Sequence, residues 1–229
     1  MQKIIIIISF TGLFSCISLP DAIGKENELI IIISPEDNEI LRPQFLKLFS
    51  HTIYTPQPEP EFKIIFKNPW DFEYVNKNGN ILIASLDIPK DSTGDLLMNR
   101  LVHPTNKNKS IFILEDMYVT NQIICGIHTL DSISMDNVII NNREWILNNF
   151  RNSSNKRMES NIFKYGKNKS LSKIISQMFG YTLDLQSDYQ IIKSDSLNSY
   201  IWLGRGFPYR WITIHIGIKS EYLNQTTAW

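Results

Sequence analysis

The chain has 229 residues, and its 23 lysines and arginines balance its 23 aspartates and glutamates. This zero formal charge excludes the clustered basic excess by which proteins bind nucleic acid or an anionic membrane surface. Two cysteines exclude a disulfide-rich scaffold and a four-thiolate zinc site, and a hydrophobic content of 43% excludes a disordered chain.

The N-terminus has the pattern of a bacterial lipoprotein signal peptide. Lys3 precedes an apolar run over residues 4–13, and Leu13, Ser15 and Cys16 match the apolar, small and cysteine positions of a lipobox. As a helix this run extends only about 15 Å, half of a hydrocarbon core of about 30 Å, so it is too short to span a membrane. Phe14 departs from the pattern, because a small residue is usual there.

In this interpretation residues 1–15 are removed, and Cys16 becomes the acylated first residue of the mature chain. Ile17, and not an aspartate, follows the cysteine, which favours the outer membrane over retention in the inner membrane; the side of that membrane is left open. Residues 16–27 are rich in turn-forming and polar residues and are expected to form an acylated tether. An ordinary cleaved signal peptide and a buried N-terminal strand remain as alternatives.

Residues 28–130 are predicted to form an N-terminal α+β subdomain. Five consecutive apolar residues, 29–33, predict a strand that is buried on both faces. Ser34 and Pro35 predict the start of a helix that ends near Ser50. Short helices are expected after Pro69 and near residues 95–102, and further strands at residues 62–67, 80–86, 110–115 and 122–129.

Residues 131–229 are predicted to be a helical segment followed by antiparallel strands. A helix over residues 131–150 continues as a polar helix or hairpin to residue 165, with residues 153–155 as its weakest point. Ser170 and Gly180 are expected to cap one more helix. Strands follow at residues 181–185, 189–193, 200–205 and 210–218. The predicted fold class is therefore α+β, with mixed or antiparallel sheets, packed helices and two subdomains.

Several segments together resemble a family of Bacteroidota envelope lipoproteins, the domain of unknown function 4837 (DUF4837) family. The similar segments, in order after the lipobox, are residues 28–34, 56–62 (PQPEPEF), 80–83 (NILI), 116–124 (DMYVTNQII), 179–181 (FGY) and 200–205 (YIWLGR). The resemblance implies an anchored envelope protein of unknown activity and supplies no catalytic residues. Members of that family continue past the point that matches residues 221–223, so the resemblance also implies that this chain is C-terminally truncated.

The residues that usually carry chemistry form no recognisable motif. His51, His103, His128 and His215 lie far apart, and no HExxH spacing places two of them on one helical face. Cys125 has apolar neighbours, which predicts a buried structural thiol. A nucleophile elbow and a phosphate-binding loop are also missing. The sequence therefore predicts no catalytic residue, no metal site and no cofactor.

One candidate ligand patch lies in the last predicted hairpin. It combines two cations with three aromatic side chains, which can grip a carboxylate, a phosphate or a sugar. Its residues are Trp202, Arg205, Tyr209, Arg210 and Trp211. The alternative is ordinary hairpin packing with solvated arginines.

Two functional classes follow from these observations. The favoured class is a membrane-anchored envelope lipoprotein without enzymatic activity, a binding or assembly module for an envelope protein, a glycan or a small ligand. The alternative is an anchored hydrolase or transferase whose site is assembled from distant residues, for which Glu115, His128, Arg205 and His215 are the candidates. An acid, a histidine and an arginine that converge in one pocket would favour the enzyme.

Overall fold

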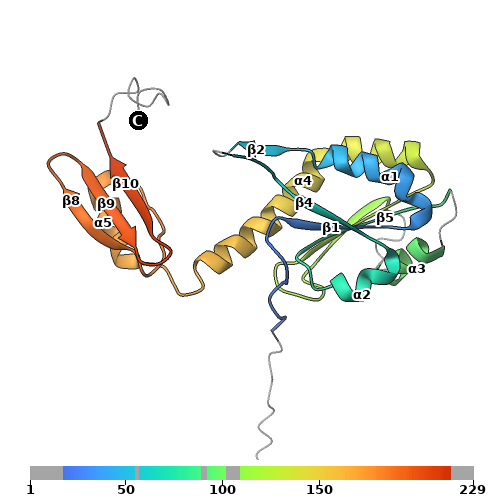
Figure 1. The fold of residues 1–229 in the computed structure, drawn as a ribbon, viewed down its shortest axis with the longest axis horizontal. Helices are drawn as coiled ribbons and strands as arrows, with labels where there is room; N and C mark the ends of the chain where they lie inside the picture. The colour runs from blue at the N-terminus through green and yellow to red at the C-terminus, as the bar shows by residue number, and fades with distance from the viewer. Residues whose placement is uncertain (1–17, 55–56, 89–91, 102–108, 218–229) are drawn as a thin grey trace, which may run out of the picture. The chain divides into compact units, whose positions relative to one another are not determined.

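The computed structural model describes residues 18–54, 57–88, 92–101 and 109–217, which belong to two compact units, Met1–Asn155 and Lys156–Trp229 (Figure 1). The predicted α+β class with packed helices is confirmed. The units divide later than the predicted boundary at residue 130, because the first part of helix α4 (Ser132–Ile162) packs onto the first unit's sheet. Within the described ranges, no helix is both long and apolar enough to cross a membrane.

The first unit is built around a five-stranded sheet in the order β4-β1-β5-β7-β6. Four strands are parallel, and β6 runs antiparallel to β7. Two short strands, β2 and β3, form a separate antiparallel pair. Besides α4, the elements are β1 (Glu28–Ile33), α1 (Pro35–Leu48), β2 (Thr52–Tyr54), β3 (Pro58–Pro60), β4 (Lys63–Lys67), η1 (Pro69–Asp71), α2 (Phe72–Val75), β5 (Asn80–Leu86), α3 (Ser92–Leu101), β6 (Ile111–Glu115) and β7 (Ile123–Thr129).

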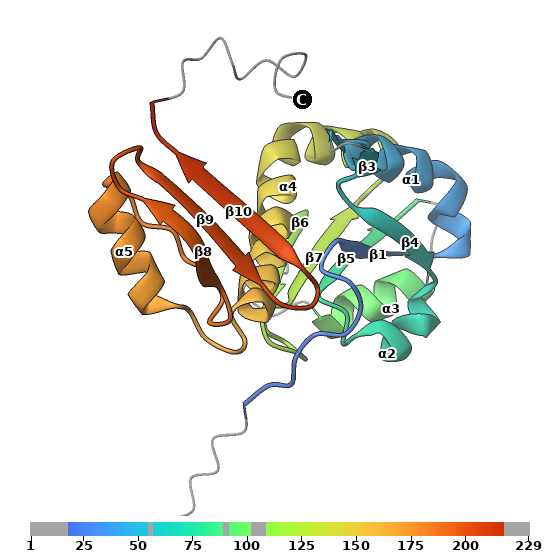
Figure 2. The same ribbon diagram turned by 60° about the vertical axis from the view of Figure 1, so that its left-hand side comes forward.

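The sheet that contains β1 is the middle one of three layers, with helices on both sides (Figures 1 and 2). All side chains of β1 from Leu29 to Ile33 are at most 2% exposed, which confirms the prediction of a strand buried on both faces. Leu29, Ile31 and Ile33 belong to the core beneath α1 and α4. Ile30 and Ile32 belong to the core with α2 and α3 on the opposite face. The helices therefore cover both faces of the sheet.

A buried asparagine holds the amino ends of the parallel strands. Asn80, at the start of β5, is fully buried, and its Nδ2 lies 3.0 Å from the carbonyl oxygen of Glu26 and 2.9 Å from that of Glu28. The same nitrogen lies 3.1 Å from Oγ of Ser154 on α4. Asn80 thus connects the entry to β1, the start of β5 and α4 by hydrogen bonds alone.

Helix α4 continues without a break through residues 153–155, which the sequence marks as its weakest point. Ser153 and Ser154 are each only 8% exposed. The hydroxyl of Ser153 donates a hydrogen bond of 2.8 Å to the carbonyl oxygen of Asn121, and Ser154 pairs with Asn80. These contacts with the sheet's loops compensate for the low helix propensity of serine.

The second unit, beyond Asn155, has a three-stranded antiparallel sheet in the order β10-β9-β8. Helix α5 (Lys169–Phe179) packs on one face of β8 (Gln190–Asp195), β9 (Tyr200–Arg205) and β10 (Arg210–His215). Asn168 caps α5 in place of the predicted Ser170, because its Oδ1 accepts the backbone N–H of Leu171. Gly180 ends the helix in the left-handed conformation, as predicted.

The predicted strand at residues 181–185 does not form. Its residues run back along α5, where Leu185 is buried and the carbonyl oxygen of Leu183 accepts a 2.7 Å hydrogen bond from the hydroxyl of Ser172. The alternating apolar pattern is therefore used for packing against a helix and not for strand pairing.

A second polar connection joins α4 to the β2/β3 pair. Arg151 donates to both carboxylate oxygens of Glu61, from Nε at 2.6 Å and from Nη2 at 2.9 Å, and Nδ1 of His51 lies 3.1 Å from the same carboxylate. The side chain of Glu61 is only 13% exposed. The hydrogen bond from Arg151, with its positive charge, holds the pKa of Glu61 below its usual range.

Removing the Asn80 side-chain amide should destabilise the first unit. We expect Asn80→Ala to lower the free energy of unfolding by about 1–3 kcal/mol, because the buried hydroxyl of Ser154 and two partly buried carbonyl oxygens lose their donor. Urea denaturation followed by circular dichroism measures the change. Asn149→Ala is the matched control, since the side-chain amide of half-buried Asn149 donates to the carbonyl oxygen of Trp145 in its own helix, and it should change stability by less than about 0.5 kcal/mol. Equal effects of the two substitutions would contradict the role of Asn80.

Removing the Arg151 guanidinium should alter the pH dependence of stability. Because the folded pKa of Glu61 is lowered, the contribution of this ion pair is fully present above the ordinary glutamate pKa of about 4.3 and disappears as pH falls through the folded pKa. We expect Arg151→Met to cost about 1–3 kcal/mol at pH 7, and its difference from the wild type to shrink at acidic pH. Urea titrations across this pH range test the expectation, with Arg143→Met as the control on the same helix. A difference that stays constant with pH would contradict it.

Candidate functional site

The carboxyl ends of the parallel strands in the first unit form the edge where ligands commonly bind. The helix that follows β1, α1, packs on one face of the sheet, and α3, which follows β5, packs on the other. The chain therefore leaves these neighbouring strands in opposite directions, and such a switch point opens a crevice at the carboxyl ends.

Asp37 fixes the geometry of this edge. The hydroxyl of Ser34 accepts the backbone N–H of Asp37 at 3.2 Å, which confirms the predicted cap of α1. The Asp37 side chain is fully buried, and its Oδ2 accepts the backbone N–H of Leu86 at 2.9 Å. This acid does more than complement the helix dipole: it joins the start of α1 to the end of β5.

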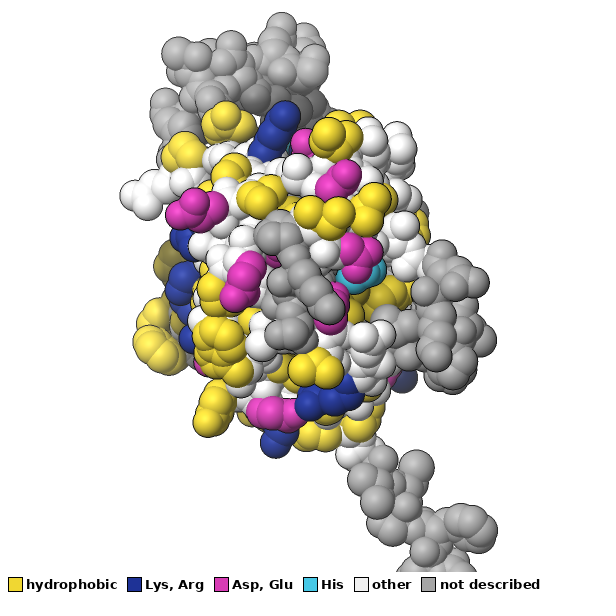
Figure 3. Space-filling view, turned by 90° about the vertical axis from the view of Figure 1, so that its right-hand side faces the viewer, with side chains coloured by type: hydrophobic (Ala, Val, Ile, Leu, Met, Phe, Trp, Pro, Cys, Tyr) yellow, Lys and Arg dark blue, Asp and Glu magenta, His cyan; other side chains and the backbone are white. Residues whose placement is uncertain are grey.

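Three chemistry-bearing side chains meet beside this edge. Asp87 directly follows β5, His128 is the second-last residue of β7, and Asp95 lies in α3. Nε2 of His128 lies 3.2 Å from Oδ1 of Asp87, and its Nδ1 lies 4.0 Å from Oδ1 of Asp95. Figure 3 looks onto this end of the molecule and shows a histidine side chain with acidic side chains beside it. We call these three residues the Asp-Asp-His cluster.

Neither His51 nor His215 joins the cluster. His51 pairs with Glu61, and His215 packs edge-on against the ring of Tyr200 in the second unit. His103 lies outside the described residues, as does Cys16. The sequence places His128 on a strand, but residue spacing does not connect it to its acidic neighbours, because Asp87 and Asp95 become neighbours of His128 only when β5 pairs with β7.

Within each unit, the residues considered for an enzyme are not brought together. Glu115 pairs with Ile123 at the amino end of β7, whereas His128 lies near its carboxyl end. In the second unit, Arg205 ends β9 and His215 pairs with Tyr200 at the other end of the same hairpin.

Cys125 is the buried thiol that the sequence predicts. It is fully buried in the core beneath α1 and α4, and burial raises its pKa to about 12. A thiol that stays protonated is a poor nucleophile, so Cys125 contributes to packing only.

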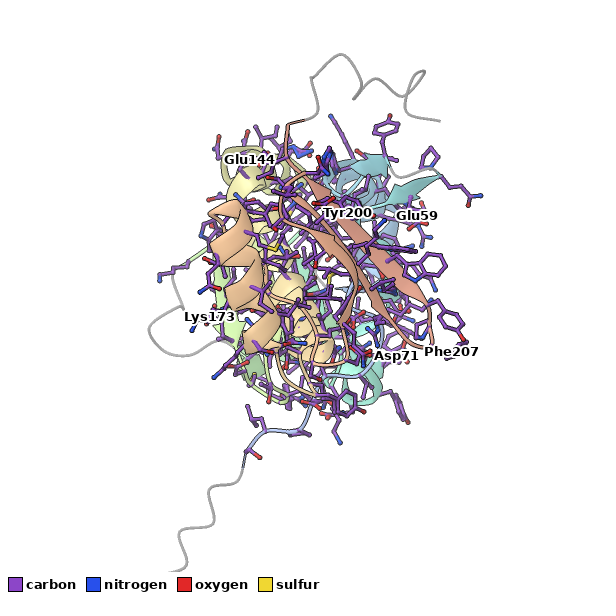
Figure 4. The ribbon with its side chains drawn as sticks, turned by 90° about the vertical axis from the view of Figure 1, so that its left-hand side faces the viewer. Glu59, Asp71, Glu144, Lys173, Tyr200 and Phe207 are labelled. Atoms are coloured by element: carbon purple, nitrogen blue, oxygen red, sulfur yellow. The ribbon has the colours of Figure 1, made fainter. Side chains whose placement is uncertain are left out.

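The aromatic and cationic patch is divided between the two faces of the second unit's sheet. Trp202 and Trp211 pack edge to face, with ring centroids 6.5 Å apart. Arg205 lies on the opposite face, because successive strand residues alternate, and it binds Asp188 at 2.8 Å and Gln186. Arg210 is exposed, Tyr209 is 74% exposed, and Figure 4 shows Phe207 in the turn at the far end of the hairpin from Tyr200. Ligand binding by this patch stays a prediction.

A cavity of about 500 Å³ lies between α1 and α4 on the first unit, a size typical of small-molecule pockets. Buried Leu48 and Ile139 supply apolar surface, Lys47 and Arg143 supply two cations, and Asp136 supplies one carboxylate. Among the described residues, neither cation has an ion-pair partner. Oε1 of Gln44 is buried in the same wall and accepts no hydrogen bond from the described part of the chain. We call this cavity the α1/α4 pocket.

Comparison with known proteins corrects the family suggested by the sequence motifs. The matching family is described as Domain of unknown function (DUF8532), over residues 22–163, and it is not the DUF4837 family. The short segments that suggested DUF4837 are strand and turn signals, which unrelated folds share. No curated protein and no solved structure matches the chain. Because the match covers more than half of the 229 residues, the chain belongs to the DUF8532 family.

Proposed function

We propose that the protein is a lipid-anchored protein of a bacterial cell envelope, held at the outer membrane, and that its folded part is a binding module without enzymatic activity. The anchor rests on the lipobox-like sequence that ends at Cys16. The binding role rests on the α1/α4 pocket, which joins apolar walls to two cations that form no ion pair with the described part of the chain.

Hydrogen bonds attach residues 19–23 to the loops of the first unit's sheet. The carbonyl oxygens of Leu19 and Pro20 accept hydrogen bonds from the side chain and the backbone of Thr120, at 3.0 and 2.9 Å. Ile23 donates to the carbonyl oxygen of Lys77 at 3.0 Å. These partners precede β7 and β5, so the segment is attached to the amino ends of the parallel strands.

Cys16 precedes Leu19 by three positions, and this stretch of chain spans at most about 10 Å. An acylated Cys16 would therefore keep the amino ends of the strands close to the bilayer. Leu19, Ile23 and Met117 are 39–51% exposed near this end, and they supply apolar surface that suits a lipid interface. The carboxyl ends of the strands would then face away from the membrane.

The pocket favours a small amphipathic anion. Lys47 and Arg143 can bind a carboxylate or phosphate, while Leu48 and Ile139 receive an apolar chain. An anchored hydrolase or transferase has less support, because within each unit the two candidate residues lie at opposite ends of paired strands. The hairpin patch is a second candidate binding surface, for a glycan or an envelope protein.

Acylation has a direct test in bacterial cells. We expect radiolabelled palmitate to enter the wild-type chain and not Cys16→Ala, because the thiol carries the first acyl chains. Cys125→Ala is the control, since that thiol is buried, and it should label like the wild type. Equal labelling of the wild type and Cys16→Ala would contradict the anchor.

Ligand binding can be measured with decanoate as the probe. We expect one decanoate per chain by isothermal titration calorimetry, and we expect Lys47→Met/Arg143→Met to weaken binding at least about tenfold by removing both cations. Lys173→Met is the control, because this exposed lysine lies on α5 in the second unit. The same affinity in the wild type and the double variant would contradict the pocket's role.

A further inference from the structure

We propose that the Asp-Asp-His cluster binds a divalent transition-metal ion of the zinc class. The site is separate from the α1/α4 pocket and does not depend on the proposed function. One donor atom each from Asp87, Asp95 and His128 lie within 4.8 Å of one another.

The spacing of the donor atoms suits a metal. Two ligand atoms bound about 2.1 Å from a tetrahedral zinc ion lie about 3.4 Å apart. The separation of Nε2 of His128 from Oδ1 of Asp87 is 3.2 Å, close to this value. One ion binds a single ring nitrogen of His128, so the 4.0 Å between its Nδ1 and Oδ1 of Asp95 is an alternative to the contact through Nε2. One donor atom from each of the three residues still lies within 4.8 Å of the other two.

The balance of charge also favours a cation. Two carboxylates flank one imidazole, so the cluster is negative whether or not His128 is protonated. Among the described residues, no lysine or arginine lies within ion-pair distance of Asp87 or Asp95. The carboxylates of Asp87 and Asp95, with donor oxygens within 4.8 Å of each other, repel, and a divalent ion removes that repulsion.

His128 carries the second, independent observation. Its Nδ1 atom is buried and forms no hydrogen bond with the described part of the chain. Buried polar atoms are nearly always paired, and a neutral imidazole nitrogen without a partner offers its lone pair to a metal.

The backbone holds the three side chains in place. The N–H of Asp87 donates to the carbonyl oxygen of Thr129 at 3.0 Å, and His128 pairs with Ser85 in the β5/β7 register. The hydroxyl of Ser85 lies 3.3 Å from Oδ1 of Asp95. The ligands therefore come from two paired strands and a helix, a rigid frame for a metal site.

The ligand set decides the class of ion. One imidazole with two carboxylates suits zinc, manganese or iron, because copper(I) prefers thiolates and thioethers. Magnesium and calcium prefer oxygen ligands alone. Solvent can complete the coordination, since the side chains of Asp87 and His128 are 49% and 35% exposed.

Zinc binding by the purified full chain tests the site. We expect one zinc ion per chain by isothermal titration calorimetry, and affinity at least about tenfold lower in each of Asp87→Asn, Asp95→Asn and His128→Gln. His51→Gln is the matched control, because His51 pairs with a carboxylate that Arg151 already neutralises, and it should bind zinc like the wild type. Undiminished binding in the three cluster variants, or wild-type binding of magnesium in preference to zinc, would overturn the proposal.

Cobalt(II) provides a readout that needs no variant. The visible spectrum of the wild-type chain with cobalt should differ from that of aqueous cobalt, because imidazole and carboxylates replace water. Zinc should displace the cobalt and abolish the new bands. A spectrum identical to that of the aqueous ion would overturn the proposal even if every variant failed to fold.

Discussion

The burial of β1 on both faces is the constraint on which the first unit depends. A strand between two helical layers is shielded from water on both faces, so the buried polar groups where such strands begin and end need partners inside the protein. Asn80 and Gln122 serve the amino ends: Nε2 of Gln122 donates to the carbonyl oxygens of Asn76 and Asn78 at 2.6 and 2.8 Å. Asp37 serves the carboxyl ends through the N–H of Leu86. Three buried polar side chains thus fix where the strands begin and end.

Local signals in the sequence predict most of the elements, because their causes are local. The apolar run at residues 29–33, the Ser34-Pro35 helix start and Gly180 all act within one or two turns of chain. The errors have non-local causes. Residues 181–185 pack along α5 in place of pairing as a strand, and the serines inside α4 are supported by loops that precede β5 and β7.

The Asp-Asp-His cluster could not be predicted from the sequence for the same reason. His128 and Asp87 are separated by 41 residues, and Asn80 and Ser154 by 74. No spacing rule connects such pairs, since they meet only when two strands come into register or a helix packs on the sheet. A signal did exist: Asp87 and His128 each lie within two residues of a strand's carboxyl end, where a parallel sheet collects polar residues. Using it requires knowledge that β5 and β7 are parallel neighbours.

The direction of the strands also relates the anchor to the metal site. Residues 19–23 bond to the loops that precede β5 and β7, whereas Asp87 and His128 lie at the opposite ends of these same strands. A seven-residue strand such as β5 rises about 3.3 Å per residue, so about 20 Å separates the two ends. If Cys16 carries lipid, this length places the Asp-Asp-His cluster on the side of the unit that faces away from the bilayer, where ions in solution reach it directly. The parallel sheet would then act as a spacer between membrane attachment and metal binding.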